Sequence, residues 1–158
     1  MSNRKLVKGA VILAVSGLIA KFLGIFLKIP LQRLINDEGM GIFGLPYPIY
    51  TLMLSISIIG LPAAVSKMIS ERIALGDYGG VRKVFRISFV IIISLGALSS
   101  CFLFFCAKAM IIFLNWPQET YYSILGLAFA PFFVSIMSAF RGFFQGMQIM
   151  TPTALSQI

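Results

Sequence analysis

The chain has 158 residues, of which 59% are hydrophobic and 11% are charged, against about 25% charged residues in soluble proteins. The formal net charge is +8, and there is no histidine. This composition excludes a disordered chain, leaves too few free cations for a nucleic-acid-binding face, and removes most support for a metal site or a catalytic triad. The mean hydropathy of +0.96 over the whole length predicts an integral membrane protein.

Four hydrophobic segments are long enough to cross a bilayer, which takes roughly 20 apolar residues. In chain order they cover residues 6–34, 42–65, 84–114 and 121–144. They lack the period-two alternation of strands, and turn residues separate them. We therefore predict an all-α, polytopic membrane protein with four transmembrane helices and no soluble domain. The first segment is long enough to favour a retained helix over a cleaved signal peptide.

The first segment contains two lysines, Lys21 and Lys28, although a lysine at depth costs roughly 2.5–3.5 kcal/mol on insertion scales. They are seven residues apart, close to two helical turns, and share one face with Gly17 and Gly24. A face of cations and small residues predicts a polar cavity that binds an anion. The alternative is that the lysines, Lys28 above all, extend along the helix to the membrane interface.

The second segment is irregular, with Pro46 and Pro48 at one end and Gly60 and Pro62 at the other. Proline removes a backbone donor and clashes with the preceding turn, so we expect a broken helix or hinge here. Transporters tolerate such breaks beside a wet cavity. A kink that serves packing alone is the alternative.

The third and fourth segments point to interface and packing roles. Lys108 lies near one end of the third, where a snorkelling side chain is expected. The fourth carries Ser138, Gly142 and Gly146 at a spacing of four, which is typical of close helix packing. No Asp or Glu falls inside a segment, so a membrane-embedded acid for proton coupling is missing.

The distribution of cations predicts the orientation. Lys and Arg are concentrated in the N-terminal tail and in the connection at 67–86, whereas the other connections are net acidic. The positive-inside rule therefore places the N-terminus in the cytoplasm.

Four short stretches carry a recognisable pattern, namely KFLG at 21–24, IGLPAAVSK at 59–67, RGFFQGM at 141–147 and TPTA at 151–154. They are similar to the polysaccharide-transport branch of the MOP flippase superfamily, and most of all to its stage V sporulation protein B and MurJ-like group from Gram-positive bacteria. The resemblance implies the first four helices of one lobe of a two-lobed transporter. Members of this branch move undecaprenyl-linked polysaccharide or peptidoglycan precursors between leaflets by alternating access, without a cofactor or metal.

The resemblance also implies site residues for the lipid diphosphate. Lys21 and Arg33 match basic residues on the family's first helix, and a further one is in register with Leu27, next to Lys28. The family's lipid II flippases carry an aspartate and an arginine on the second helix, whereas the second segment of this chain contains neither residue. The glycan carried is therefore left open.

The length of the chain leaves several hypotheses about its function open. The chain ends at Ile158, where the resemblance implies a fifth helix, so we expect either a truncated flippase or one completed by another chain. A small four-helix multidrug-type transporter working as a dimer is the alternative, disfavoured by the missing acid. A non-transporting membrane scaffold stays open. An enzyme is the weakest hypothesis, because no nucleophile–base pair is recognisable.

Overall fold

The computed structural model describes residues 3–58 and 60–157, with side chains described for these except 3–6, 8 and 56–58. Every element in this part is an α-helix, which confirms the predicted all-α class. In chain order the helices are α1 (Asn3–Gly44), α2 (Tyr47–Ile58), α3 (Leu61–Ala74), α4 (Tyr78–Leu114), α5 (Thr120–Ala128), α6 (Ala130–Gly146) and α7 (Thr151–Leu155).

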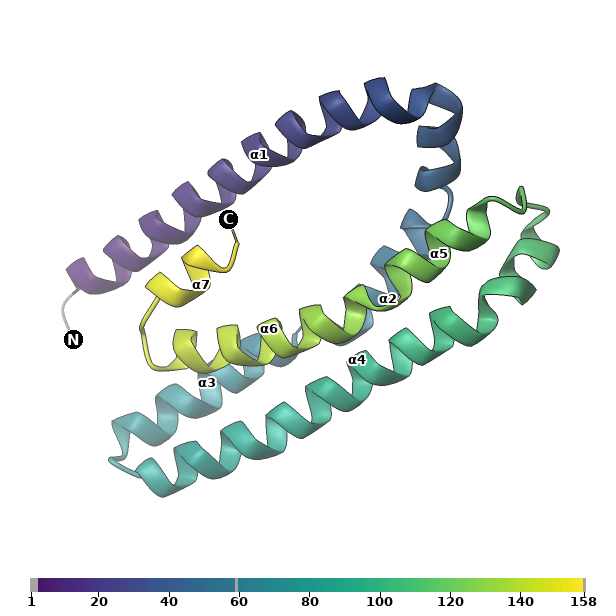
Figure 1. Ribbon diagram of the computed structural model, residues 1–158. Coiled ribbons are helices and arrows are strands. Elements are labelled where there is room, and N and C mark those ends of the chain that lie inside the picture. Colours follow the sequence, from purple (N-terminus) through teal and green to yellow (C-terminus); the bar gives the residue numbers. More distant parts are fainter. Residues whose placement is uncertain (1–2, 59, 158) are drawn as a thin grey trace.

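Three stretches of the described chain are long and apolar enough to cross a membrane, namely Gly9–Gly44, Tyr78–Leu114 and Thr120–Gly146. The last comprises α5 and α6, which run nearly in line through Phe129 (Figure 1). The prediction of four transmembrane helices is therefore met only in part, because three helical stretches rather than four are long enough to cross a membrane. The missing one is the second, 42–65, which is divided among the end of α1, α2 and the start of α3.

Prolines and one glycine explain why the second segment is divided. α1 ends at Gly44 and α2 begins at Tyr47, so Pro46 stands in the turn between them. Gly60, just before α3, has φ 90°, in the left-handed region that side chains disfavour. Pro62 follows in the first turn of α3, where its missing N–H is harmless. The predicted break in the second segment is thus confirmed.

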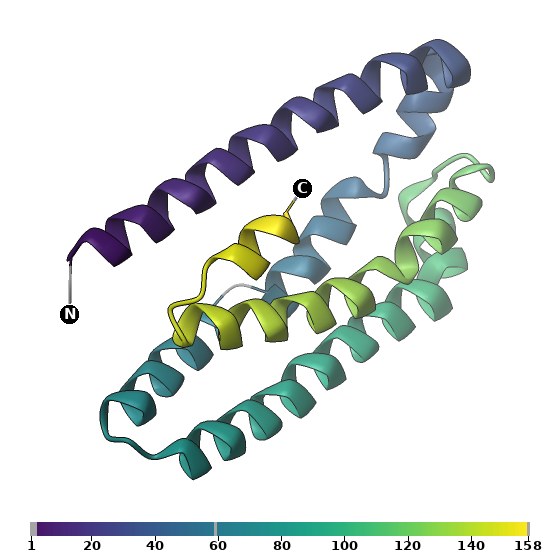
Figure 2. The same ribbon diagram turned by 60° about the vertical axis from the view of Figure 1, so that its left-hand side comes forward.

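The expected end of the first segment near residue 34 also differs from the structure. Asn36 has φ 60° and ψ 174°, so the helical path is interrupted there, but helix resumes and α1 continues to Gly44. Figures 1 and 2 both show α1 as a long arm that bends before α2.

The helices alternate in direction between two ends of the molecule. Figure 1 shows the start of α1, the turn between α3 and α4, and the connection from α6 to α7 at one end. The bend between α1 and α2 and the connection from α4 to α5 lie at the other end. Such an up-and-down arrangement suits a chain that crosses a bilayer repeatedly.

The best-packed part of the molecule is the bundle of α3, α4 and α6. Its core consists of Val65, Ile69, Val81, Val84, Ile92 and Ala139. Glycines allow the helices to approach closely: a Cβ added to Gly142 would lie 3.0 Å from the Pro62 carbonyl oxygen, and one on Gly146 would lie 2.9 Å from that of Ser66. Ser138, Gly142 and Gly146 are all buried, so the predicted packing stripe is confirmed.

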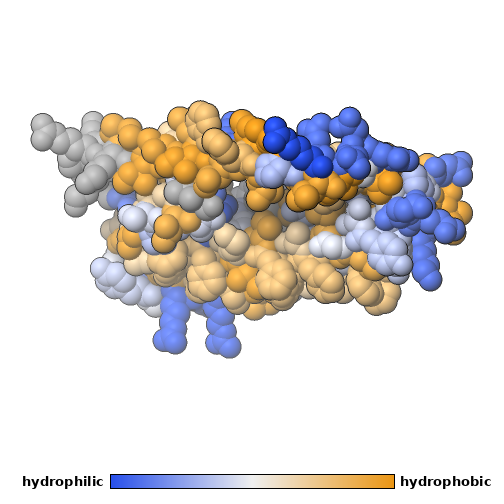
Figure 3. Space-filling view, turned by 45° about the horizontal axis from the view of Figure 1, so that its top comes forward, coloured by the Kyte–Doolittle hydropathy of each residue, from blue (hydrophilic) through white to orange (hydrophobic). Residues whose placement is uncertain are grey.

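Apolar side chains also cover the outside of the molecule. Figure 3 shows hydrophobic residues over much of the visible face. In the apolar window of α1 only 6% of the residues are buried, against 22% in α4 and 33% in the α5–α6 stretch. A predominantly apolar helix with so few buried residues is what lipid, rather than water, would surround over most of its surface.

Candidate functional site

The predicted site lies on α1, and the four residues that we call the lysine face are Gly17, Lys21, Gly24 and Lys28. α1 is helical throughout this stretch, so the spacing of seven keeps the two lysines on one side. Both lysine side chains are exposed, and an added Cβ at either glycine would meet no atom of the described residues within 4 Å. Neither lysine has a carboxylate within 4.0 Å in the described chain. The lysine face is therefore open and unneutralised.

Arg33 does not join the lysine face. It follows Lys28 by five residues, which turns it about 140° around the helix. There it lines a shallow hollow beside the Asn36 bend, in which the Gln32 side-chain amide donates a hydrogen bond of 3.0 Å to Asp37. The structure thus brings two of the three predicted diphosphate-binding cations together and leaves the third on another side.

The four residues expected to form a hinge occupy two distinct breaks. Pro46 is buried in the turn before α2, and Pro48 is exposed in the first turn of that helix. Gly60 meets no atom within 4 Å at an added Cβ, so what it supplies is its left-handed backbone rather than space. Pro62 packs against Gly142 of α6. Movement about these breaks stays a prediction.

The C-terminal residues join α1 to the bundle through Arg141, a contact that the sequence did not predict. Arg141 is half-buried on α6; its Nε donates to Ser156 Oγ at 2.8 Å and its Nη2 to the Ser156 carbonyl oxygen at 2.5 Å. On the neighbouring residue, Gln157 Oε1 lies 3.0 Å from the buried Ser16 hydroxyl of α1. The position of Arg141 inside the fourth hydrophobic segment indicates that this cation needs a polar partner, but it does not identify the partner.

Lys108, the cation predicted near one end of the third hydrophobic segment, lies close to the C-terminal end of α4. Lys108 Nζ lies 6.0 Å from the ring centroid of Tyr121, which is within reach of a cation–π interaction. Gln118, Glu119 and Tyr122 line the same hollow. This placement beside aromatic and polar groups agrees with the predicted snorkelling role.

The turn between α3 and α4 is held by one carboxylate. Asp77 caps α4 by accepting a hydrogen bond of 2.8 Å from the Gly80 backbone N–H. Arg72 Nη1 donates to its other oxygen at 2.9 Å. The bond from Gly80, helped by Arg72, lowers the pKa of Asp77 below 3.8.

Comparison with known proteins places this geometry in a family. The profile of the family described as "Polysaccharide biosynthesis protein" matches residues 6–158. Stage V sporulation protein B of Bacillus subtilis (strain 168) is 30% identical over 100% of this chain and 30% of its own length. The lipid II flippase MurJ of the same organism is 34% identical over 99% of this chain and 30% of its own length.

A third relative, the uncharacterized membrane protein YabM of the same organism, is 26% identical over 96% of this chain and 27% of its own length. No solved structure matches the chain. The chain therefore spans about 30% of the length of the first two relatives. The family match over nearly all of the sequence, together with three long apolar helices, confirms the resemblance: this chain is a multi-pass membrane protein that belongs to the polysaccharide biosynthesis family of MOP-superfamily flippases.

Proposed function

We propose that this chain forms part of a flippase that moves undecaprenyl-linked polysaccharide or peptidoglycan precursors across the bacterial cytoplasmic membrane. The observation that carries this proposal is the open lysine face of α1, in a chain whose relatives include a lipid II flippase. The chain spans about 30% of the relatives' length, and in this proposal its residues supply one part of a transport pathway that further helices complete.

The lysine face suits a lipid diphosphate. Lys21 and Lys28 lie about 10 Å apart along the helix axis, and their flexible stems let both ammonium groups turn toward one ligand between them. In a water-poor membrane cavity their attraction to a diphosphate is stronger than in bulk water. Gly17 and Gly24 present no side chain, so the bulky headgroup can approach the helix. Arg33, on another side, meets the headgroup at the outer mouth.

We further propose that α2 and α3 together form the second membrane crossing in chain order, which is interrupted at Gly60. The chain then crosses the membrane four times. The two breaks, at Pro46–Pro48 and Gly60–Pro62, then act as hinges while the cavity opens alternately to the two leaflets. With the N-terminus in the cytoplasm, the basic turn between α3 and α4 lies on that side as well, in accordance with the positive-inside rule.

A chimera tests this function. Residues 1–158 replace the matched segment of the B. subtilis MurJ relative, and the arrival of lipid-linked precursor in the outer leaflet of membrane vesicles is measured. We expect the chimera to flip the precursor. Lys21→Ala and Lys28→Ala should each reduce the rate about tenfold or more, since each removes a charge-assisted hydrogen bond worth about 1.5–3 kcal/mol.

Lys108→Ala is the matched control, because it removes a cation from an apolar stretch of α4 away from the lysine face. It should leave flipping nearly unchanged. Normal flipping by the Lys21/Lys28 double variant would refute the role of the lysine face. A folded, membrane-inserted chimera that flips nothing would contradict the flippase function itself and favour a scaffold.

A further inference from the structure

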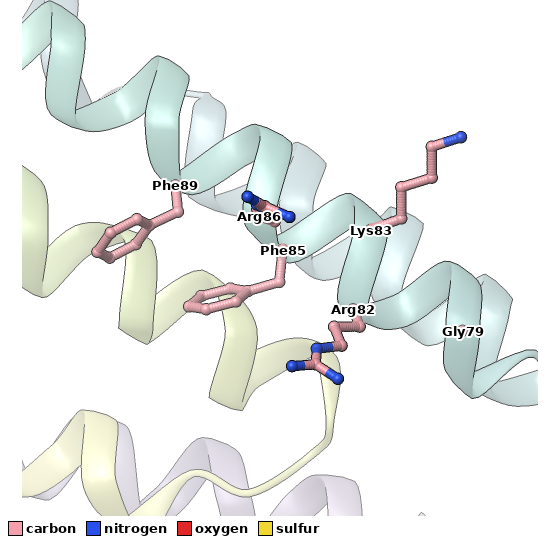
Figure 4. A pocket seen from close by; sticks show the side chains of 6 residues that line it. All are labelled: Gly79, Arg82, Lys83, Phe85, Arg86 and Phe89. Carbon is pink, nitrogen blue, oxygen red and sulfur yellow. The ribbon is translucent and has the colours of Figure 1, made fainter.

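A second cationic site lies at the end of the bundle where α4 begins. We call it the arginine hollow; it has a volume of about 520 Å³ and is lined by Gly79, Arg82, Lys83, Phe85, Arg86 and Phe89. Figure 4 shows the two phenyl rings directed toward α6 and Arg82 extended toward the connection that follows α6, while Lys83 points away on the other side of α4. The hollow is thus a cleft of two arginines and an aromatic wall.

The positive charge of this hollow is not compensated by the protein. Arg82 and Arg86 are four residues apart on one helix face, a spacing at which like charges repel. Neither has a carboxylate within 4.0 Å in the described chain. The acidic side chains nearby in the sequence are already engaged, Glu71 with Lys67 and Asp77 with Arg72. An anion between the two arginines would relieve this repulsion.

An apolar shelf adjoins the arginines. The Phe85 ring centroid lies 4.6 Å from that of Phe143 and 5.8 Å from that of Phe140, and the Phe89 centroid lies 5.6 Å from that of Phe140. Phe140 keeps 42% of its surface exposed. The shelf formed by these four rings on α4 and α6 therefore offers an apolar surface directly beside the cations.

We propose that the arginine hollow binds an anionic phospholipid of the surrounding leaflet, with its phosphate between Arg82 and Arg86 and its acyl chains along the phenylalanine shelf. Guanidinium groups bind phosphate oxygens in a bidentate manner, and basic hollows between membrane helices bind anionic headgroups. A free phosphate would satisfy the arginines but not the shelf. This lipid is a resident ligand, and its site is separate from the lysine face on α1.

Lipid titration of the purified full chain tests this proposal. The chain is held in zwitterionic detergent, and binding of phosphatidylglycerol is measured by native mass spectrometry and by the shift in thermal unfolding. We expect phosphatidylglycerol to bind and phosphatidylcholine not to bind. Arg82→Gln and Arg86→Gln should each weaken binding about fivefold, and together about 20-fold. Both side chains are exposed, so the variants should fold normally.

Lys67→Gln is the matched control, because it removes one positive charge from an exposed side chain on α3 that does not line the arginine hollow. It should change binding less than twofold. An equal loss in Lys67→Gln, or none in the double arginine variant, would overturn the site in favour of diffuse charge attraction. Glycerol phosphate, which has the headgroup chemistry without acyl chains, should bind at least about tenfold more weakly. Equal affinity would overturn the lipid assignment.

Discussion

The lysine face of α1 and the bundle of α3, α4 and α6 use glycine in opposite ways. In the bundle, Gly142 and Gly146 bring backbones together, and added methyl groups there would lie about 3 Å or less from neighbouring atoms. On the lysine face, an added Cβ at Gly17 or Gly24 would meet no atom of the described residues within 4 Å. The bundle glycines are therefore closely packed by neighbouring helices, whereas those of the lysine face are not packed against any other described part of the chain. Glycine thus permits close helix packing in the bundle and leaves an uncovered surface on the lysine face.

The largest expected loss of stability comes from adding a methyl group at the close contact between α3 and α6. In Gly146→Ala the new Cβ would lie 2.7 Å from Ile69 Cβ and 2.9 Å from the Ser66 carbonyl oxygen, so α3 and α6 must move apart. We expect the free energy of unfolding to fall by about 1–3 kcal/mol. Reversible unfolding of the chain in mixed micelles with increasing denaturing detergent measures this change.

Gly24→Ala is the corresponding change on the open face. Its Cβ meets nothing within 4 Å, and alanine is favoured over glycine inside a helix by about 0.5–1 kcal/mol. The variant should be as stable as the parent or slightly more stable. If Gly24→Ala destabilised the chain and Gly146→Ala did not, the contrast between the two regions would be wrong. Slower flipping by a stable Gly24→Ala chimera would strengthen it.

A second prediction concerns the link between α6 and α7. Arg141→Lys keeps the charge but loses the two-point contact with Ser156, so residues 151–157 should separate from α6 more often. The cost should be about 1.5 kcal/mol, and amide hydrogen exchange of residues 151–157 should become roughly tenfold faster. Arg33→Lys, which touches neither α7 nor Ser156, is the control. Unchanged exchange in Arg141→Lys would show that contacts other than the two bonds from Arg141 to Ser156 hold α7 in place.

A smaller effect is expected where α1 meets the C-terminal residues. Ser16→Ala removes the hydroxyl that lies 3.0 Å from Gln157 Oε1 and should cost about 0.5–1.5 kcal/mol. Spin labels at the exposed positions Val11 and Leu155 should then show a broader range of distances as α1 moves away. Ser94→Ala, at an exposed position of α4, should leave this distribution unchanged. An unaltered distribution in Ser16→Ala would mean that other contacts hold α1 in place.

The sequence predicted what depends on local pattern and missed what depends on the fold. Apolar length and helical spacing are properties of a single segment. They were sufficient to predict the long helices and the placement of Lys21 and Lys28 on one face of α1. The prolines correctly indicated a break in the second segment, but not that Gly60 would leave two short helices. The contact of Arg141 with Ser156 joins residues brought together by the turn after α6, and no spacing rule predicts such a turn.

The smallest expected effect is a pH dependence confined to one region. Because its hydrogen bonds lower the pKa of Asp77 in the folded chain, the ionised carboxylate stabilises the turn between α3 and α4 above pH 3.8, and this stabilisation is lost as the pH falls through the lowered pKa. Residues 3–35 of α1 contain no acidic side chain. Acid should therefore reduce the hydrogen-exchange protection of residues 75–81 and leave that of residues 3–35 unchanged.

Asp77→Asn distinguishes the contribution of the carboxylate charge from that of the helix cap. Asparagine is as good an N-cap as aspartate, so the Gly80 N–H keeps an acceptor while the ion pair with Arg72 is lost. The variant should thus lose the acid sensitivity of residues 75–81 but retain most of their protection at neutral pH, whereas Asp77→Ala should lose both. If Asp77→Asn remained acid-sensitive, another carboxylate would control the turn. If residues 3–35 responded to acid as strongly as 75–81, α1 and the bundle would not be separate units.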